Sequence, residues 1–504
     1  MSRAHRAAPA RAAARPEDAR LPLGSTFAYG FQHVLTMYGG IIAPPLIVGT
    51  AAGLDSTDVG MLVAACLFVG GLATLLQTVG IPFFGSQLPL VQGVSFAGVA
   101  TMTAILDGGG GLQSVFGAVI VASLIGLLIT PVFAKVIRFF PPVVTGVVIT
   151  TIGLTLMPVA ANWAMGGSSA APDYGSVSNI GLAGLTLLLV LLLSKLGSST
   201  ISRLSILIAI VLGTVFALIT GKADFSGVGT GPVFAFPQPF AFGLPTFEAA
   251  AIISMVIVIL VTLTETTADI IAVGEIVDTK VDAKRIGNGL RADMLSSALS
   301  PVFNSFTQSA FAQNVGLVAI TGVKSRFVVS AGGLILVILG LLPILGRVVA
   351  AVPTPVLGGA GIVLFGTVAA SGIRTLAKVD YRDNMNFIIV ATSIGFGMIP
   401  IAAPTFYDRF PTWFGTIFHS GISSAAVMAI LMNILFNHIR SGNPKDPSVF
   451  AEGADRIVRV ENLAALKEGD HVQDGKLLDA DGQEIPLTTT GTEPHEDLHR
   501  DTNP

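Results

Sequence analysis

The stretch FAQNVGLVAIT, residues 311–321, places two carboxamide side chains, Gln313 and Asn314, inside an otherwise apolar run. In the hydrocarbon core of a bilayer, every polar group needs a hydrogen-bond partner within the protein. An apolar segment that breaks at polar side chains therefore usually lines a cavity rather than facing lipid. We expect residues 311–321 to line a cavity that binds a ligand.

The composition is that of a polytopic membrane protein. Of the 504 residues, 52% are hydrophobic and 12% are charged, against roughly 25% charged residues in soluble globular domains. Cys66 is the only cysteine, so the chain has neither a disulfide framework nor a cysteine-rich metal site. We expect no metal, no cofactor and no nucleic-acid partner.

Apolar tracts separated by polar breaks predict an all-α fold of about fourteen transmembrane spans, each of about 20 residues. The expected spans are residues 27–49, 58–80, 88–104, 113–134, 139–158, 180–197, 203–221, 248–274, 285–303, 309–322, 327–350, 353–372, 384–403 and 418–437. Residues 221–247 carry four prolines and predict a long loop outside the membrane between two halves.

Both ends of the chain are expected in the cytoplasm. Five arginines precede the first span, namely Arg3, Arg6, Arg11, Arg15 and Arg20, and basic residues favour the cytoplasmic side. The first apolar segment contains Gln32 and His33 and is followed by many more spans, so we interpret it as a retained helix rather than a cleaved signal. An even number of spans returns the acidic C-terminal tail to the cytoplasm, where it is expected to be disordered or weakly folded.

The two halves of the chain are related in sequence. Eight residues of the first half match residues exactly 212 positions later, as Pro131 matches Pro343. The pairs are Leu124 and Leu336, Leu127 and Leu339, Pro131 and Pro343, Lys135 and Arg347, Val136 and Val348, Pro141 and Pro353, Val144 and Val356, and Gly146 and Gly358. With an odd number of spans per half, about seven, the second copy enters the membrane from the opposite side. This predicts an inverted repeat, the architecture of many secondary transporters.

The repeat also predicts where the chain breaks. Residues 88–96 precede the first matched block much as residues 309–318 precede the second, and both segments are short and interrupted by polar residues. We expect spans 3 and 10 to be discontinuous, each an extended piece followed by a half helix that exposes backbone N–H groups to a ligand. This places Ser95 and Phe96 opposite Ala312 and Gln313.

Glu265 and Asp269 are the most informative charges, because they interrupt the apolar tract that begins near Ala249. Their i, i+4 spacing puts both side chains on one helix face. A carboxylate near the centre of a spanning helix costs roughly 2.5 to 3.5 kcal/mol on insertion scales, so it is expected to face the protein interior. Glu265 is then a candidate proton carrier, although a neutral or paired carboxyl group that only links helices is the alternative.

The other polar candidates each have a structural alternative. Gln313 and Asn314 could hold helices together by hydrogen bonds. His33 could relay a proton or simply orient a neighbour. Phe96 could stack on a planar ligand, whereas Ser95 could do no more than cap the half helix.

These residues resemble the nucleobase-ascorbate transporters, also called the nucleobase:cation symporter-2 family, over approximately residues 25–437. The resemblance rests on several motifs in the right order. They are Gln32-His33, Glu265 and Asp269 before Gly274-Glu275, Phe303-Asn304-Ser305-Phe306, Gln313-Asn314-Val315-Gly316 with Thr321, and the segment PTPVLGG at residues 353–359.

The resemblance implies a core domain and a gate domain in a homodimer, with the core moving substrate by an elevator-like displacement. The implied parts are a cytoplasmic tail at residues 1–24, core-domain parts at 25–137 and 248–350, gate-domain parts at 138–247 and 351–438, and a cytoplasmic acidic tail at 439–504. Bacterial relatives are generally proton symporters, although sodium coupling stays open.

Site roles follow from the same resemblance. Glu265 and Gln313 would hold the base by side-chain hydrogen bonds, and the backbone at Phe96 and Ala312 would complete the site, with Ser95 beside it. Proton coupling or support of the site falls to Asp269, His33, Gln32, Asn314, Gly316 and Thr321.

The substrate implied is an oxidised purine, urate or xanthine, because uracil carriers tend to carry Glu at the position of Gln313 and His at that of Asp269. Ser95 resembles urate or dual-substrate carriers, whereas Thr307-Gln308 departs from the family pattern. The alternatives are a uracil or other nucleobase permease of the same family, or an anion carrier of related inverted-repeat fold. An enzyme is disfavoured, since the chain lacks a Gly-x-Ser-x-Gly elbow and a His-Glu-x-x-His motif.

Overall fold

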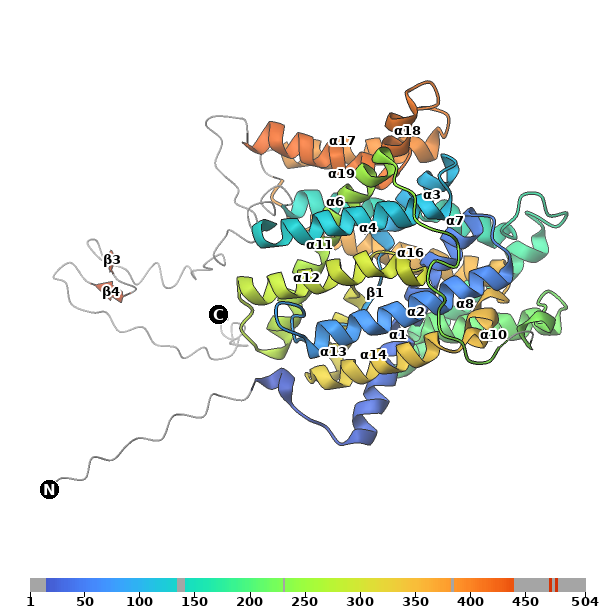
Figure 1. Ribbon diagram of the computed structural model, residues 1–504, viewed down its shortest axis with the longest axis horizontal. Helices are drawn as coiled ribbons and strands as arrows, with labels where there is room; N and C mark the ends of the chain where they lie inside the picture. Colours follow the sequence, from blue (N-terminus) through green and yellow to red (C-terminus); the bar gives the residue numbers. More distant parts are fainter. Residues whose placement is uncertain are drawn as a thin grey trace, which may run out of the picture. The chain divides into compact units, whose positions relative to one another are not determined.

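The computed structural model describes residues 15–133, 141–229, 232–381, 385–438, 471–473 and 476–478. The protein is mostly helical, and Figure 1 shows many of its long helices lying side by side. The described elements up to residue 229 are η1 (Pro16–Asp18), α1 (Leu23–Ala51), α2 (Ser56–Val79), β1 (Gln92–Val94), η2 (Phe96–Gly98), α3 (Val99–Asp107), α4 (Gly111–Ile129), η3 (Thr130–Val132), α6 (Pro142–Thr155), α7 (Met157–Met165), α8 (Val177–Leu196), α9 (Ser199–Arg203), α10 (Ser205–Ile219) and η5 (Ser226–Gly229).

The second half repeats the order of helices, a short strand and a half helix. Its described elements are α11 (Ala249–Val277), α12 (Ala283–Leu299), η6 (Ser300–Phe303), β2 (Gln308–Ala310), α13 (Ala312–Thr321), α14 (Arg326–Gly340), α15 (Pro343–Ala350), α16 (Thr354–Leu376), α17 (Met385–Ala402), α18 (Thr412–Phe418), α19 (Gly421–Asn433) and η7 (Ile434–His438).

Within the described residues, eight helices are long and apolar enough to cross a membrane, and a bent pair of helices would make a ninth. Four shorter apolar helices accompany them, at residues 96–107, 205–219, 312–321 and 421–437. The protein is therefore a multi-pass membrane protein.

The two discontinuous segments have the predicted form. Strand β1 pairs with β2 in antiparallel register, with Gln92 opposite Ala310 and Val94 opposite Gln308. Each strand leads into a short helix, α3 by way of η2 in the first half and α13 in the second. Because the strands are antiparallel, the two half helices begin at opposite ends of the pair. The residue directly across from Ser95 is Thr307, whose carbonyl oxygen accepts a hydrogen bond from the Ser95 N–H at 2.9 Å.

The expected span over residues 327–350 is not one straight helix. Helices α14 and α15 meet at an angle of 80° across a short break. Pro343 is the first residue of α15, and proline cannot donate the backbone hydrogen bond that would continue α14. In the first half, Lys135 and Val136 of the matched block lie outside the described residues.

Most of the helix packing falls into two groups, which α11 joins by packing against α18 and α19. In one group, α14 packs against α1 and α2, α15 packs against α2, and α4 packs against α11 and α12. In the other group, α16 packs against α6, α7, α8 and α10, and α17 packs against α6 and α19. Close contacts depend on glycine, since a Cβ atom on Gly71 of α2 would lie 2.6 Å from both Gly333 O and Val337 N of α14.

The proline-rich stretch of residues 221–247 is held against its neighbours by specific contacts. The Ala235 N–H donates to Leu341 O at 3.1 Å, and the Asn304 side-chain amide donates to Gln238 O at 2.7 Å. The Phe236 ring packs edge-on against Phe68, with centroids 5.3 Å apart. These contacts hold residues 235–238 against the helices, in the part of the chain that leads into α11 (Figure 1).

Part of the predicted N-terminal tail is bound to the helices. Glu17 is fully buried and pairs with Arg285 at 2.5 Å, and Asp18 pairs with Arg326 at 2.6 Å. Residues 1–14, and with them Arg3, Arg6 and Arg11, lie outside the described residues. Most of the predicted C-terminal tail, 439–504, also lies outside them. The exception is a hairpin of β3 (His471–Gln473) and β4 (Lys476–Leu478).

Candidate functional site

A cavity of about 470 Å³ lies where the two discontinuous segments meet α6, α11 and α16. It contains six of the residues singled out in the sequence, namely Ser95, Phe96, Glu265, Asp269, Ala312 and Gln313. The rest of its lining is Val94, Pro142, Thr145, Ile149, Ile152, Thr264, Ala268, Ala272, Ser309, Ala310, Phe311, Thr367, Val368, Ser371, Arg374, Thr375 and Lys378. Of the stretch 311–321 that was expected to line a cavity, only Phe311, Ala312 and Gln313 line this one.

Two helix beginnings face this cavity. Ser95 caps η2, with its Oγ accepting from the Ala97 N–H at 3.2 Å. Helix α13 has no side-chain cap at its N-terminus, and the N–H groups of Ala312 and Gln313 have no acceptor among the described residues. Uncapped N–H groups at a helix N-terminus attract acceptor atoms and partial negative charge. The cavity therefore offers backbone donors to a polar ligand.

The acidic pair on α11 faces the same space. Glu265 is half-buried and Asp269 is buried, and both line the cavity one helical turn apart. The Oδ2 atom of Asp269 is buried without a hydrogen-bond partner in the described structure. Together with the Gln313 carboxamide, the site presents carboxyl, amide and backbone N–H groups within one cavity.

The structure places five other candidates outside this cavity lining. The Asn314 Nδ2 atom lies 3.0 Å from both His33 Nδ1 and His33 O, so these two buried residues join α13 to α1. Thr321 Oγ1 donates to Leu317 O at 2.8 Å near the end of α13. Gln32 is half-buried on α1, and Gly316 is exposed on α13. These contacts favour the structural interpretation of Asn314 and His33.

Asp293, which hydrogen-bonds to the helix that carries Glu265, was not predicted from the sequence. It is buried on α12, where Oδ2 accepts from Thr266 Oγ1 at 2.7 Å and Oδ1 accepts from Gln77 Nε2 at 3.3 Å. Thr266 follows Glu265 directly on α11. The place of Asp293 between Ala292 and Met294, inside an expected apolar span, could have marked this charged residue as a candidate.

Arg374 and Lys378 were also missed. Both are exposed residues at the end of α16, and both line the cavity on the side of α16 rather than α11. The available signal was their place just beyond the expected span 353–372. They give the cavity positive charge in addition to its carboxyl groups.

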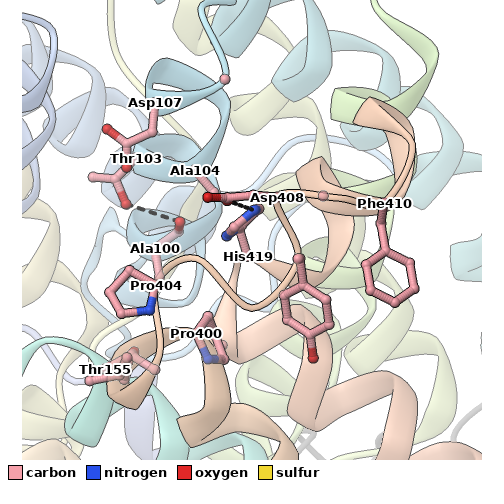
Figure 2. Close-up of a pocket in the computed structure, with 15 residues that line it drawn as sticks. Ala100, Thr103, Ala104, Asp107, Thr155, Pro400, Pro404, Asp408, Phe410 and His419 are labelled. Carbon is pink, nitrogen blue, oxygen red and sulfur yellow. Dashed lines mark hydrogen bonds and ion pairs between the residues drawn. The ribbon is translucent and has the colours of Figure 1, made fainter.

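A second cavity, of about 540 Å³, lies at the other ends of α3 and α6. Figure 2 shows Asp408 and His419 facing each other there, with Thr103 and Asp107 of α3 beside them. His419 Nε2 lies 3.7 Å from Asp408 Oδ1. Neither the strand pair nor the uncapped N-terminus of α13 lines this second cavity. The cavity at Glu265 and Gln313 is therefore the candidate ligand site.

Many apolar helices surround a cavity at which two interrupted segments meet, which is the arrangement of a membrane transporter. A family model described as "Permease family" matches residues 24–406. The chain belongs to this family, the nucleobase:cation symporter-2 family that its motifs resemble.

Curated relatives support this membership. The chain is 39% identical over 423 residues to the uric acid transporter UacT of Escherichia coli K12, covering 83% of this chain and 88% of that protein. It is 41% identical over 414 residues to the xanthine permease of Bacillus subtilis 168, covering 82% and 94%. It is 38% identical over 415 residues to the uric acid permease PucJ of Bacillus subtilis 168, covering 82% and 92%.

Solved structures of other transporters share the fold. The transmembrane domain of the cyanobacterial bicarbonate transporter BicA matches with a TM-score of 0.55 at 15% identity, covering 83% of this chain and 99% of that one. Murine Slc26a9, an anion transporter solved in the inward-facing state, matches with a TM-score of 0.58 at 13% identity, covering 84% and 70%.

Proposed function

We propose that the chain imports an oxidised purine, urate or xanthine or both, across the cell membrane by proton symport. The observation that carries the proposal is the meeting of Glu265, Gln313 and the uncapped start of α13 in one cavity. The names of the relatives, which are uric acid and xanthine permeases, support the choice of substrate.

The groups in the cavity suit the edges of an oxidised purine. The Gln313 carboxamide has one donor and one acceptor edge, able to pair with adjacent N–H and C=O groups, and Glu265 can accept hydrogen bonds from ring N–H groups. The N–H groups of Ala312 and Gln313 can donate to a purine carbonyl oxygen. Phe96 lines the same cavity, where its ring can pack on the flat base.

Glu265 is the proposed link between proton and purine. When this carboxyl group takes up a proton, the site loses a charge that would be costly to move through a low-dielectric region. When both the proton and the purine are bound, the site can switch from facing one side of the membrane to facing the other. Asp269, which lines the same cavity, and Asp293, which hydrogen-bonds to Thr266 beside Glu265, are proposed to support this role. Sodium coupling is the alternative, and uptake driven by a sodium gradient rather than a proton gradient would distinguish it.

The architecture proposed is an elevator of about fourteen spans arranged as an inverted repeat. The core would comprise residues 25–137 and 248–350, and the gate residues 138–247 and 351–438, in a homodimer whose termini are cytoplasmic. The two packing groups of helices support this division. Between the proposed core and gate, Thr101 Oγ1 of α3 lies 2.9 Å from Ser420 Oγ beside α19, a contact that must break if the core slides.

Uptake of labelled urate, xanthine and uracil by cells that lack their own carriers tests the function. We expect uptake of urate or xanthine, its collapse with a protonophore, and little uptake of uracil. In the same assay, Glu265→Gln is expected to abolish accumulation of purine. Glu248→Gln is its control, because Glu248 is exposed at the start of the same helix and does not line the cavity. Uptake of uracil alone, or of no base, would reject the substrate assignment.

An anion carrier is the second candidate, because the solved structures that share the fold include a bicarbonate transporter. A small inorganic anion offers neither the ring N–H groups that Glu265 can accept from nor a flat ring for Phe96, although both side chains line the cavity. Sulfate and bicarbonate in the same uptake assay distinguish the two candidates.

A further inference from the structure

The walls of the cavity carry opposite charges. Glu265 and Asp269 line it from α11, whereas Arg374 and Lys378 line it from α16. The acidic residues lie next to the start of α13, and the basic residues lie in the last turn of α16 and just beyond it. The cavity lining therefore has an acidic side on α11 and a basic side on α16.

The basic residues belong to a polar stripe on α16. Thr367, Ser371, Arg374, Thr375 and Lys378 all line the cavity, and their spacing of three and four residues puts them on one helix face. The positions between them include buried Gly372 and Leu376, which face the protein instead. The stripe thus continues the cavity wall toward its basic end.

Both cations are free to meet a ligand. Within the described part of the chain, Arg374 and Lys378 have no ion-pair or hydrogen-bond partner for their side chains. Arg285 and Arg326 differ, since each is held by an acidic residue and by backbone carbonyl oxygens. Basic residues at a helix end can also serve only to orient the chain in the membrane, but that role does not require them to line a cavity.

We propose that Arg374 and Lys378 make the site selective for the anionic form of the purine. This inference rests on the proposed function and adds a specificity that Glu265 and Gln313 do not supply. Urate has an acidic ring N–H and is a monoanion at neutral pH, whereas xanthine at mildly acidic pH is mostly uncharged. A purine anion is attracted by the two cations on the α16 side of the cavity, whereas an uncharged purine is not.

The expected effect is modest because the cations are exposed. Exposed charges in water interact weakly and are screened by salt over about 10 Å at 0.1 M. We expect the loss of both to weaken urate binding on the order of fivefold at low salt, and less as the salt concentration rises.

The test is equilibrium binding of labelled urate and labelled xanthine to the purified full-length chain at mildly acidic pH, over a series of salt concentrations. The variant is Arg374→Gln with Lys378→Gln. The matched control is Lys195→Gln with Arg203→Gln, which removes the same charge from α8 and α9 outside the cavity lining. Arg374→Lys preserves the charge and is expected to keep urate affinity.

The inference expects a selective loss. Urate affinity falls in the double variant and xanthine affinity does not, and salt weakens urate binding to the unaltered chain more than xanthine binding. The inference is overturned by equal losses for both purines, by no loss for urate, or by salt-independent urate binding to the unaltered chain. The salt dependence of urate binding to the unaltered chain tests the inference even if the double variant does not fold. Absence of any purine binding to the unaltered chain overturns the proposed function as well.

Discussion

Thr266 Oγ1 on α11 lies 2.7 Å from Asp293 Oδ2 on α12, one residue along the chain from Glu265. Thr266 Oγ1 also lies 3.4 Å from the Ala310 N–H in β2, at the edge of the strand pair. One hydroxyl group therefore connects a buried carboxyl group, the helix that carries Glu265 and the strand that leads into α13. This connection gives Asp293 a positioning role for the site.

Asp293→Asn is expected to destabilise the protein and to reduce purine uptake. The carboxylate accepts from both Thr266 and Gln77, and asparagine has a single carbonyl oxygen, so one buried donor loses its acceptor at a cost of about 1–3 kcal/mol. Thermal unfolding of the purified chain measures the effect. Asp282→Asn is the control, because Asp282 caps α12 at an exposed position and asparagine caps equally well. An unchanged unfolding temperature in Asp293→Asn would show that the hydrogen bonds of Asp293 to Thr266 and Gln77 do not stabilise the fold.

Glu265→Gln is expected to abolish accumulation of purine against its gradient, because glutamine keeps the hydrogen-bonding shape but cannot bind and release a proton. Exchange of labelled for unlabelled purine across the membrane is expected to be affected less than net accumulation. The measurement is uptake at equal amounts of protein in the membrane. Proton-driven accumulation retained by Glu265→Gln contradicts the assignment of Glu265 as the coupling residue.

Gln313→Glu is expected to weaken binding of both urate and xanthine. The change removes the amide donor and adds a third carboxyl group to a cavity that already contains Glu265 and Asp269. A loss of about tenfold corresponds to roughly 1.4 kcal/mol, the scale of one good hydrogen bond. Competition binding against labelled urate measures it. Unchanged affinity for both purines would make Gln313 a structural residue.

Gly71→Ala is expected to lower the unfolding temperature, although alanine favours helices over glycine by about 1 kcal/mol. The added Cβ atom would lie 2.6 Å from backbone atoms of α14, and helices cannot yield there without moving apart, at a typical cost of about 1–3 kcal/mol. Gly184→Ala on α8 is the control, since a Cβ atom there meets nothing within 4 Å. An equal or higher unfolding temperature for Gly71→Ala would show that the two helices are not locked at this contact.

The sequence predicted those features of the site that depend on local pattern. Polar interruption of short apolar tracts located both strand and half-helix breaks, and the i, i+4 spacing of Glu265 and Asp269 placed both on the cavity face. The bend between α14 and α15 was missed because hydropathy alone does not register the break at Pro343. The roles of Asp293 and Arg374 could not be predicted, because they depend on which helices meet in space.

Long-range pairs limited the prediction in the same way. His33 and Asn314 are 281 residues apart in sequence and share two close contacts. Sequence pattern left open whether His33 relays a proton or orients a neighbour. The contact with Asn314, away from the cavity lining, favours the second role.

The most direct measurement is uptake of labelled urate and xanthine by the purified chain in lipid vesicles with an imposed proton gradient. The account predicts accumulation of purine when the outside is acidic, its loss with a protonophore, and its absence in Glu265→Gln. No purine uptake, or accumulation that is unchanged by the protonophore, would contradict it.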